Sequence, residues 1–136
     1  MNEVANIQVI KDIYAAFGRR DMPFIMNAIS DKLDMWGIQS DTDTGVPWHL
    51  KIRSKGDVPK FFEALAKTVD HTVFIPKDFA AGGDEVYCTL HMEQVVLATG
   101  QKLVSDVVHK FTLRDGKIVA WNGFEDTAKS QALFRR

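Results

Sequence analysis

The spacing of apolar and polar residues changes about halfway along the chain. In the first half, apolar residues recur at intervals of three and four, which is typical of amphipathic helices. In the second half they alternate with polar residues, which is typical of strands with one buried face. The sequence therefore predicts helices first and then a sheet built mostly from the second half.

Three helices are expected before residue 70. The first covers residues 4–17, and Gly18 follows where a helix commonly ends. The second begins after Asp21, a good N-cap, with Pro23 in its first turn. The third begins at Asp57. Its buried stripe is expected to consist of Val58, Phe62, Leu65 and Val69.

The remaining pattern predicts strands. The segment "KLDMWGI" is too short for a helix and is interpreted as a first strand. Four apolar stretches follow, broken at Pro76, 82–84, 99–100 and 115–116, which are the turn signals of hairpins. This order of elements predicts an α+β domain in which the helices lie against one face of a curved antiparallel sheet.

Composition narrows the class of protein. A chain of 136 residues fits a single domain covering 1–136, and 46% apolar with 26% charged residues is ordinary for a globular protein. A net charge of −1 predicts no nucleic-acid or membrane partner. Cys88 is the lone cysteine, and neither a signal peptide nor a run of 18 apolar residues is present, so a cytoplasmic location is expected.

Two segments carry a resemblance to a known family. In "GVPWHLKIRSKGDVPKFFEAL" the pattern is Pro47-Trp48, then Gly56, then a helix opening at Asp57. In "VVHKFTLRDGKIVAWNGFEDTA" it is the turn at 115–118 followed by Asp126. The chain resembles the SnoaL-like branch of the nuclear transport factor 2-like superfamily, whose members include polyketide cyclases and ketosteroid isomerases.

The resemblance implies a fold and a place for a site. The fold is a cone of three N-terminal helices on a strongly curved antiparallel or mixed sheet, with an apolar pocket at its open end. The resemblance also implies a homodimer formed through the outer face of the sheet. Strand parity offers a set of residues for that contact: Tyr87, Thr89, His91, Val104 and Val108.

The catalytic positions of related enzymes match this chain poorly. The isomerase branch uses a Tyr, an Asp and a protonated Asp, and the resemblance places these at Ile13, close to Gly37 and at His109. The cyclase branch uses an Asp that falls at Gly123. Neither mechanism is therefore expected to operate unchanged, and His109 alone has a titratable side chain.

Strand parity, taken with the resemblance, selects the side chains that face the pocket: Val86, Cys88, Leu90, Met92, Val107, His109, Phe111, Val119, Trp121 and Glu125. His109 and Glu125 are the predicted catalytic residues, because an imidazole and a carboxylate can exchange protons near neutral pH. The alternatives are a core histidine satisfied by a group such as Ser105, and a solvated carboxylate at the end of a strand.

Aromatic and apolar side chains complete the predicted site. The ligand-binding candidates are Tyr14, Trp48, Leu90, Met92, Val107 and Trp121. Rigid rings of this kind suit a flat or cyclic apolar ligand. For Tyr14 the alternative is a core aromatic residue with its oxygen at the surface, and for Trp121 it is plain core packing. For Trp36, a third ring considered with these, the alternatives are core packing or an outward contact with a second copy.

Two functions are consistent with this pattern. The first is a cofactor-free isomerase, cyclase or dehydratase that acts on a small hydrophobic carbonyl or polyketide-like compound by acid–base catalysis. The second is a noncatalytic module of the same fold that binds a small ligand or forms dimers. No metal site is predicted, because the four histidines are not clustered and no cysteine pair exists.

Overall fold

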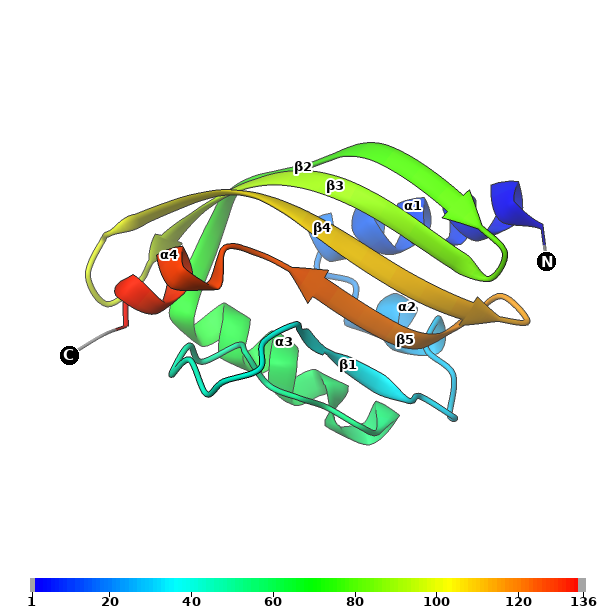
Figure 1. The fold of residues 1–136 in the computed structure, drawn as a ribbon, viewed down its shortest axis with the longest axis horizontal. Helices are drawn as coiled ribbons and strands as arrows, with labels where there is room; N and C mark the ends of the chain where they lie inside the picture. The colour runs from blue at the N-terminus through cyan, green and yellow to red at the C-terminus, as the bar shows by residue number, and fades with distance from the viewer. Residues whose placement is uncertain (1, 135–136) are drawn as a thin grey trace.

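The protein folds as a curved five-stranded sheet with helices on its concave side (Figure 1). The computed structural model describes residues 2–134. Its elements in chain order are α1 (Glu3–Gly18), α2 (Met22–Asn27), β1 (Met35–Ile38), the 3₁₀ helix η1 (Lys55–Asp57), α3 (Val58–Thr68), β2 (Val69–Gly82), β3 (Glu85–Val96), β4 (Lys102–Arg114), β5 (Lys117–Phe124) and α4 (Thr127–Ala132). The predicted α+β class, with helices before the long strands, is confirmed.

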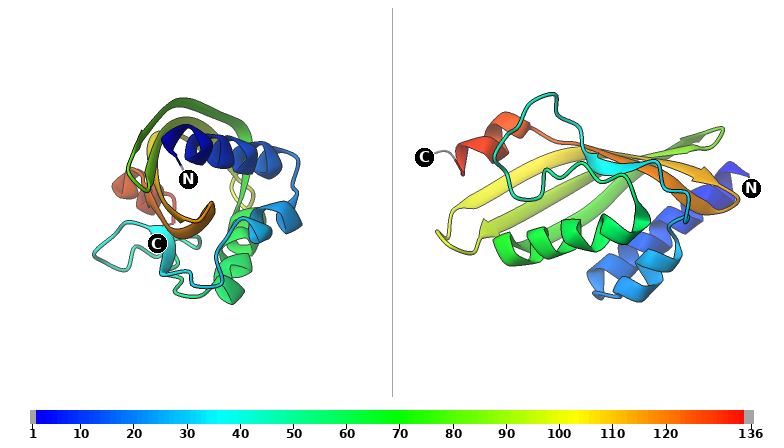
Figure 2. Two further views of the ribbon diagram at one scale, coloured as in Figure 1. Left: turned by 90° about the vertical axis from the view of Figure 1, so that its right-hand side faces the viewer. Right: turned by 90° about the horizontal axis from the view of Figure 1, so that it is seen from below.

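The strand order is β1-β5-β4-β3-β2, and the sheet is mixed. The short strand β1 pairs in parallel with β5, whereas the other neighbouring strands are antiparallel. Seen end-on, the strands curl around α1, α2 and α3 without closing into a barrel (Figure 2). These three helices therefore cover the concave face of the sheet.

The helix starts follow local capping chemistry. The side chain of Asn2 accepts a hydrogen bond from Ala5 N at 2.7 Å, and Asp21 accepts one from Phe24 N at 3.1 Å, which satisfies backbone donors in the first turns of α1 and α2. Asp57 occupies the predicted N-cap of α3 but makes no capping bond. Its carboxylate instead contacts Lys60 at 3.1 Å.

Three details of the predicted elements differ from the structure. Phe61 is buried in α3, whereas Phe62 is half-buried and Val69 already belongs to β2. Pro76 does not end a strand. It lies within β2 at a register shift, and an edge strand tolerates a residue that has no N–H to donate.

The last hairpin and the C-terminal helix set the position of β5. Asp115 and Gly116 have positive φ angles of 53° and 75°, as the tight Asp-Gly turn requires. After β5, Asp126 caps α4 by accepting a hydrogen bond from Lys129 N at 3.2 Å. The sequence pattern does not predict this helix. Across residues 2–134, no helix combines the length and the apolarity needed to cross a bilayer.

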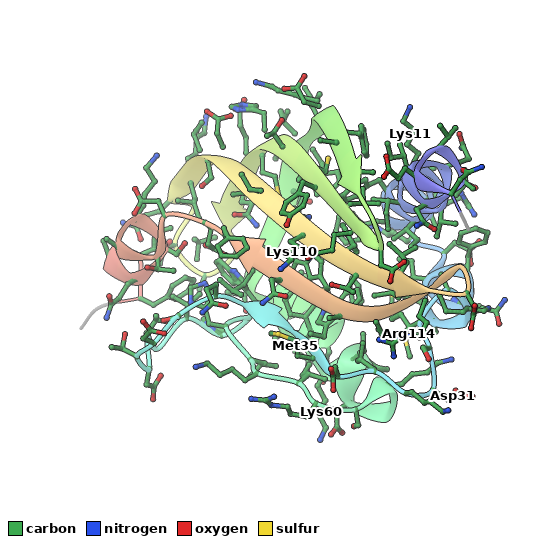
Figure 3. The ribbon with its side chains drawn as sticks, turned by 45° about the vertical axis from the view of Figure 1, so that its right-hand side comes forward. Lys11, Asp31, Met35, Lys60, Lys110 and Arg114 are labelled. Atoms are coloured by element: carbon green, nitrogen blue, oxygen red, sulfur yellow. The ribbon has the colours of Figure 1, made fainter. Side chains whose placement is uncertain are left out.

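Side chains alternate across the sheet as its pleat requires. Lys110 projects from the outer face of β4 (Figure 3). Its neighbours His109 and Phe111 therefore point to the concave side, where both are buried. The predicted parity of β4 is correct, and the inner face of the sheet lies against the helices.

Candidate functional site: an apolar cavity with a histidine and a carboxylate

A cavity lies between the concave face of the sheet and helices α1 and α3. The centres of water-sized molecules have about 80 Å³ of room in it, and the empty space counted out through its open mouth is about 720 Å³. Aromatic rings form much of its wall, among them Phe17, Trp36, Phe61, Phe74, Phe111 and Trp121. Trp36 and Trp121 pack with their ring centroids 4.9 Å apart. A wall of this kind favours a flat apolar ligand because rigid rings bury much area at little entropic cost.

His109 lies on this wall and is hydrogen-bonded to Tyr14. The Oη atom of Tyr14 is 2.9 Å from Nδ1 of His109. Tyr14 is only 8% exposed, so its oxygen is buried, and the alternative of a surface hydroxyl is wrong. Helix α1 thus supplies the partner of the imidazole, and Ser105 makes no hydrogen bond to it. No other hydrogen bond to the ring of His109 forms within residues 2–134.

The hydrogen bond to Tyr14 fixes the tautomer of the ring. Burial raises the pKa of Tyr14 far above its ordinary value, so its hydroxyl keeps the proton. The hydroxyl lies near both His109 and the thiol of Cys88, and an imidazole nitrogen is a much stronger acceptor than sulfur. We therefore assign the Tyr14 proton to the bond with Nδ1, which places the hydrogen of the neutral imidazole on Nε2.

His109 is neutral at physiological pH. Burial lowers its pKa to about 3, although the negative charge of Glu125 opposes this shift. A ring with so low a pKa does not hold a proton at pH 7. Its Nε2–H group can, however, donate a hydrogen bond to an acceptor in the cavity.

Glu125 is a buried carboxylate at the end of β5, and the alternative of a solvated carboxylate is wrong. Its side chain is 9% exposed. Trp48 Nε1 donates a hydrogen bond to Oε1 at 3.1 Å, and Ser130 Oγ donates to Oε2. His49 Nε2 lies 3.2 Å from Oε1, at an angle too poor for a regular hydrogen bond. The chain beyond β5 and the loop before η1 meet at this carboxylate.

These contacts keep Glu125 ionised. Burial by itself raises the pKa of the carboxyl group, but the contacts from His49, Ser130 and Trp48 outweigh burial and hold the pKa below its ordinary value. His49 is held in place from its other side, because Thr44 Oγ1 lies 2.6 Å from His49 Nδ1. The cavity therefore contains a carboxylate with fixed orientation and a negative charge.

His109 and Glu125 are diagonal neighbours on the concave face. His109 pairs with Gly123 across β4 and β5, and Glu125 lies two residues beyond Gly123 on the same face. Diagonal neighbours of this kind lie roughly 7–8 Å apart. A small ring could therefore contact the imidazole and the carboxylate at the same time.

The structure places most of the predicted pocket residues in the cavity wall. Tyr14, Trp48, Met92, Val107, Phe111 and Trp121 line it together with His109 and Glu125. Leu90, Val86 and Cys88 are buried but lie outside the wall, because α1 packs over that end of β3. Val119 is also buried outside the wall, at the bulge where the register of β4 and β5 shifts.

The two glycines at the family's catalytic positions differ in direction. A Cβ atom at Gly123 would meet Ile38 Cδ1 at 2.6 Å and the Trp121 ring at 3.0 Å, and both of these residues line the cavity. A Cβ atom at Gly37 would meet the carbonyl oxygen of Leu50 at 2.6 Å, so this position faces away from the cavity. Trp36 and Ile38 on either side of Gly37 supply the inward side chains of β1.

The polar residues of the site that had no sequence prediction are His49, His71, Gln94 and Ser130. Trp36 is buried in the core, which was one of the alternatives expected for it, and it also lines the cavity. Its Nε1 has no hydrogen-bond partner within residues 2–134. The position of His49 beside Trp48 could have suggested its role. No sequence signal marked Ser130, because α4 was not predicted.

A groove outside the cavity leads to its mouth. Residues between the end of α1 and α3 line this groove, including Arg20, Met22 and Ala66. Phe17, Phe62 and Phe74 line both the groove and the cavity. His71 also lines both, and it is 2.9 Å from Gln94 between Nε2 atoms. A ligand would enter past these side chains.

The comparisons with known proteins agree with this fold. A model of the SnoaL-like domain matches residues 10–121. The chain belongs to the SnoaL-like domain family. This family assignment confirms the resemblance found in the sequence. None of the curated proteins compared with the chain matches it.

Solved structures with the same fold carry diverse descriptions. An NTF2-like protein from Burkholderia thailandensis is 25% identical, with full coverage of both chains and a TM-score of 0.83. TerC, co-crystallised with polyporic acid, is 22% identical over 97% of this SnoaL-like chain and 99% of its own, with a TM-score of 0.83. An LEH-like epoxide hydrolase from M. tuberculosis is 14% identical over 97% and 90%, with a TM-score of 0.74. At such low identity, a shared fold leaves the chemistry to be argued from the site.

Proposed function

We propose that this SnoaL-like protein is a cofactor-free enzyme that moves a proton on a small hydrophobic carbonyl or polyketide-like compound, as an isomerase, a cyclase or a dehydratase. The observation that carries the proposal is the pairing of His109 and Glu125 as diagonal neighbours in an aromatic cavity. An ionised carboxylate and a neutral hydrogen-bond donor are the two groups needed to form an enol or enolate.

The two residues have different roles in this proposal. The carboxylate of Glu125 removes a proton from the carbon next to the substrate carbonyl. The Nε2–H group of His109 donates a hydrogen bond to the carbonyl oxygen as negative charge develops there. In an isomerase, protonated Glu125 then returns the proton to another carbon of the substrate, so this reaction needs no further reactant. The sequence alone suggests His109 as the proton carrier, but the His109 pKa of about 3 favours the role of hydrogen-bond donor.

Hydrogen exchange at a carbon atom tests this proposal. The probe is 2-tetralone in D₂O, and the loss of its α-proton signals is followed by ¹H NMR against a buffer control. We expect the wild-type protein to accelerate exchange. Glu125→Gln should reduce the acceleration by about 10²–10⁴-fold, and His109→Phe by about 10²–10³-fold. Glu63→Gln, at an exposed carboxylate paired with Lys67, is the matched control and should exchange like wild type.

One observation favours a second candidate, a noncatalytic ligand-binding module. The pKa values of both His109 and Glu125 are lowered, which makes each a weak proton acceptor. Binding of 2-tetralone without accelerated exchange would support this module and contradict the enzyme. Accelerated exchange that is unchanged in Glu125→Gln would remove Glu125 from the mechanism.

We also propose that the protein forms a homodimer through the outer face of the sheet. Five exposed apolar residues lie on the strands: Ile75, Tyr87, Val104, Val108 and Phe124. Charges of both signs accompany them, such as Lys110 beside Glu85 at 2.8 Å. A second copy related by a two-fold axis would cover these apolar side chains.

A cytoplasmic location is the remaining part of the proposal. Cys88 is free and buried. Burial also raises the pKa of its thiol, which keeps it protonated and unreactive. A lone reduced cysteine is typical of proteins in a reducing compartment.

A further inference from the structure

Four polar side chains form a stripe across the concave face of the sheet. They are His71, Gln94, Ser105 and Glu125, one from each of β2, β3 and β4 and one directly after β5. His71 pairs with Gln94 across β2 and β3, and the partner of Gln94 on β4, Leu103, lies two residues before Ser105. All four line the cavity, so its otherwise apolar wall has a polar edge.

The stripe has unused hydrogen-bonding capacity. Gln94 and Ser105 are 4% and 8% exposed. The amide nitrogen of Gln94 is 2.9 Å from Nε2 of His71, and its amide oxygen has no hydrogen-bond partner within residues 2–134. Ser105 Oγ makes no hydrogen bond within residues 2–134. It is also not fully buried, so a ligand or water can reach it. Burying such groups is costly unless a ligand or water completes their bonds.

The free atoms of the stripe are mostly acceptors. The amide oxygen of Gln94 and the carboxylate of Glu125 only accept hydrogen bonds, whereas Ser105 can accept or donate. Two other polar groups of the cavity are donors: Nε2–H of His109, as assigned above, and Nε1–H of Trp36, which has no partner within residues 2–134. The cavity therefore offers both donors and acceptors to a bound ligand.

We propose that this stripe determines specificity, and that the protein selects neutral planar ring compounds with a carbonyl on one edge and a hydroxyl group on another. The hydroxyl group donates to the stripe while the carbonyl accepts from His109. A carboxylate at the position of the hydroxyl would meet the negative charge of Glu125 and would be rejected. This inference rests on the proposed function, because it names the substrate class of the same site.

A series of ring compounds with one scaffold tests the stripe in the wild-type protein. The probes are 2-tetralone and its 6-hydroxy, 6-methoxy and 6-carboxy derivatives, with affinity measured at pH 6 by quenching of tryptophan fluorescence. We expect the hydroxy compound to bind about 10-fold more tightly than the methoxy compound, which cannot donate. The carboxylate should bind at least about 10-fold more weakly than the methoxy compound.

Substitutions then assign the selectivity to the stripe. Ser105→Ala and Gln94→Met should remove most of the preference for hydroxy over methoxy, and Glu125→Gln should relieve the rejection of the carboxylate. Thr112→Ala, on the outer face of β4, is the control and should keep both preferences. Thermal unfolding identifies variants that do not fold. The affinities of the wild-type protein for the four compounds test the proposal even if a variant fails to fold.

The outcomes separate the two proposals. If none of the four compounds binds, the proposed function fails. If all four bind with equal affinity, the stripe does not determine specificity, while the proposed function stands. If the carboxylate binds best, the assignment of a repelling negative charge to Glu125 is wrong.

Discussion

Tyr14 Oη and His109 Nδ1 lie 2.9 Å apart in the protein interior, joining α1 to β4 across 95 positions of sequence. This hydrogen bond gives the imidazole a fixed orientation and a fixed tautomer. It also explains why a titratable ring can lie in an apolar wall, because the buried nitrogen has a partner. The position and protonation of His109 thus depend on a residue from the opposite side of the cavity.

Tyr14→Phe should remove this bond while keeping the aromatic ring. One nitrogen of His109 would then be buried without its partner, so the free energy of unfolding should fall by about 1–3 kcal/mol. Urea unfolding measures the loss, and ¹⁵N NMR of the imidazole should show that the ring no longer has a single tautomer. Tyr87→Phe, on the outer face, is the control and should change stability by less than about 0.5 kcal/mol. Equal stability of the two variants would contradict the importance of the bond.

The low pKa of His109 predicts a pH-dependent loss of stability. Below pH 6.5 the unfolded chain binds a proton at this residue, but the native protein does not until the pH approaches about 3. Stability is therefore lost as the pH falls between these values, by about 3 kcal/mol at pH 4. Unfolding free energies at pH 7 and pH 4 should diverge less in His109→Gln than in wild type.

The comparison with His109→Gln isolates this residue. The pKa of His71 is also lowered by burial, but His71 is present in both proteins, so its contribution cancels. The same holds for Glu125, whose lowered pKa gives stability that is lost as the pH falls. Parallel pH profiles of the two proteins would show that His109 titrates normally in the folded state.

Ser130→Ala should raise the pKa of Glu125. The hydroxyl group donates a hydrogen bond to the carboxylate, and its removal withdraws support from the charged form. We expect an upward shift of the Glu125 pKa, measured by ¹³C NMR of the labelled carboxyl group. The acid limb of the pH profile for α-proton exchange of 2-tetralone should also move to higher pH. Ser54→Ala removes a similar bond to the exposed Asp57 and should leave Glu125 unchanged.

Gly123→Ala should crowd the cavity. The added methyl group would lie 2.6 Å from Ile38 Cδ1, and we expect a destabilisation of about 1–3 kcal/mol together with weaker ligand binding. Ile38→Val removes the crowded atom, so the double variant should recover part of the loss in a double-mutant cycle. Gly37→Ala meets the Leu50 backbone instead, and Ile38→Val should not rescue it. Additive effects of the Gly123 and Ile38 changes would refute the contact.

The proposed dimer predicts a dependence on outer-face apolar residues. Sedimentation velocity should give twice the mass of the chain for wild type and a single chain for Val108→Asp, because a charge would be buried in the interface. Val4→Asp, at an exposed apolar residue on α1, should remain dimeric. A monomeric wild-type protein would exclude the dimer.

Much of the fold follows from local sequence patterns. The period of the apolar residues gave the type and order of the main elements, and the Asp115-Gly116 turn fixed the register of the last hairpin. The parity of β4 placed His109 on the inner face. Pro76 and Val119 were interpreted less well, because the irregular pairing of β2 and of β5 depends on neighbouring strands.

The sequence by itself determined the α+β class and the inward direction of His109, since helix and strand periods act between residues close in the chain. The family followed from the resemblance of two segments, around 45–65 and 107–128. The tertiary structure decided the chemistry of the site. The Tyr14 bond to His109 and the contacts of Glu125 with Trp48 and Ser130 join segments that only folding brings together. Burial and these contacts set the charges of both groups, and neither can be read from one segment of the chain.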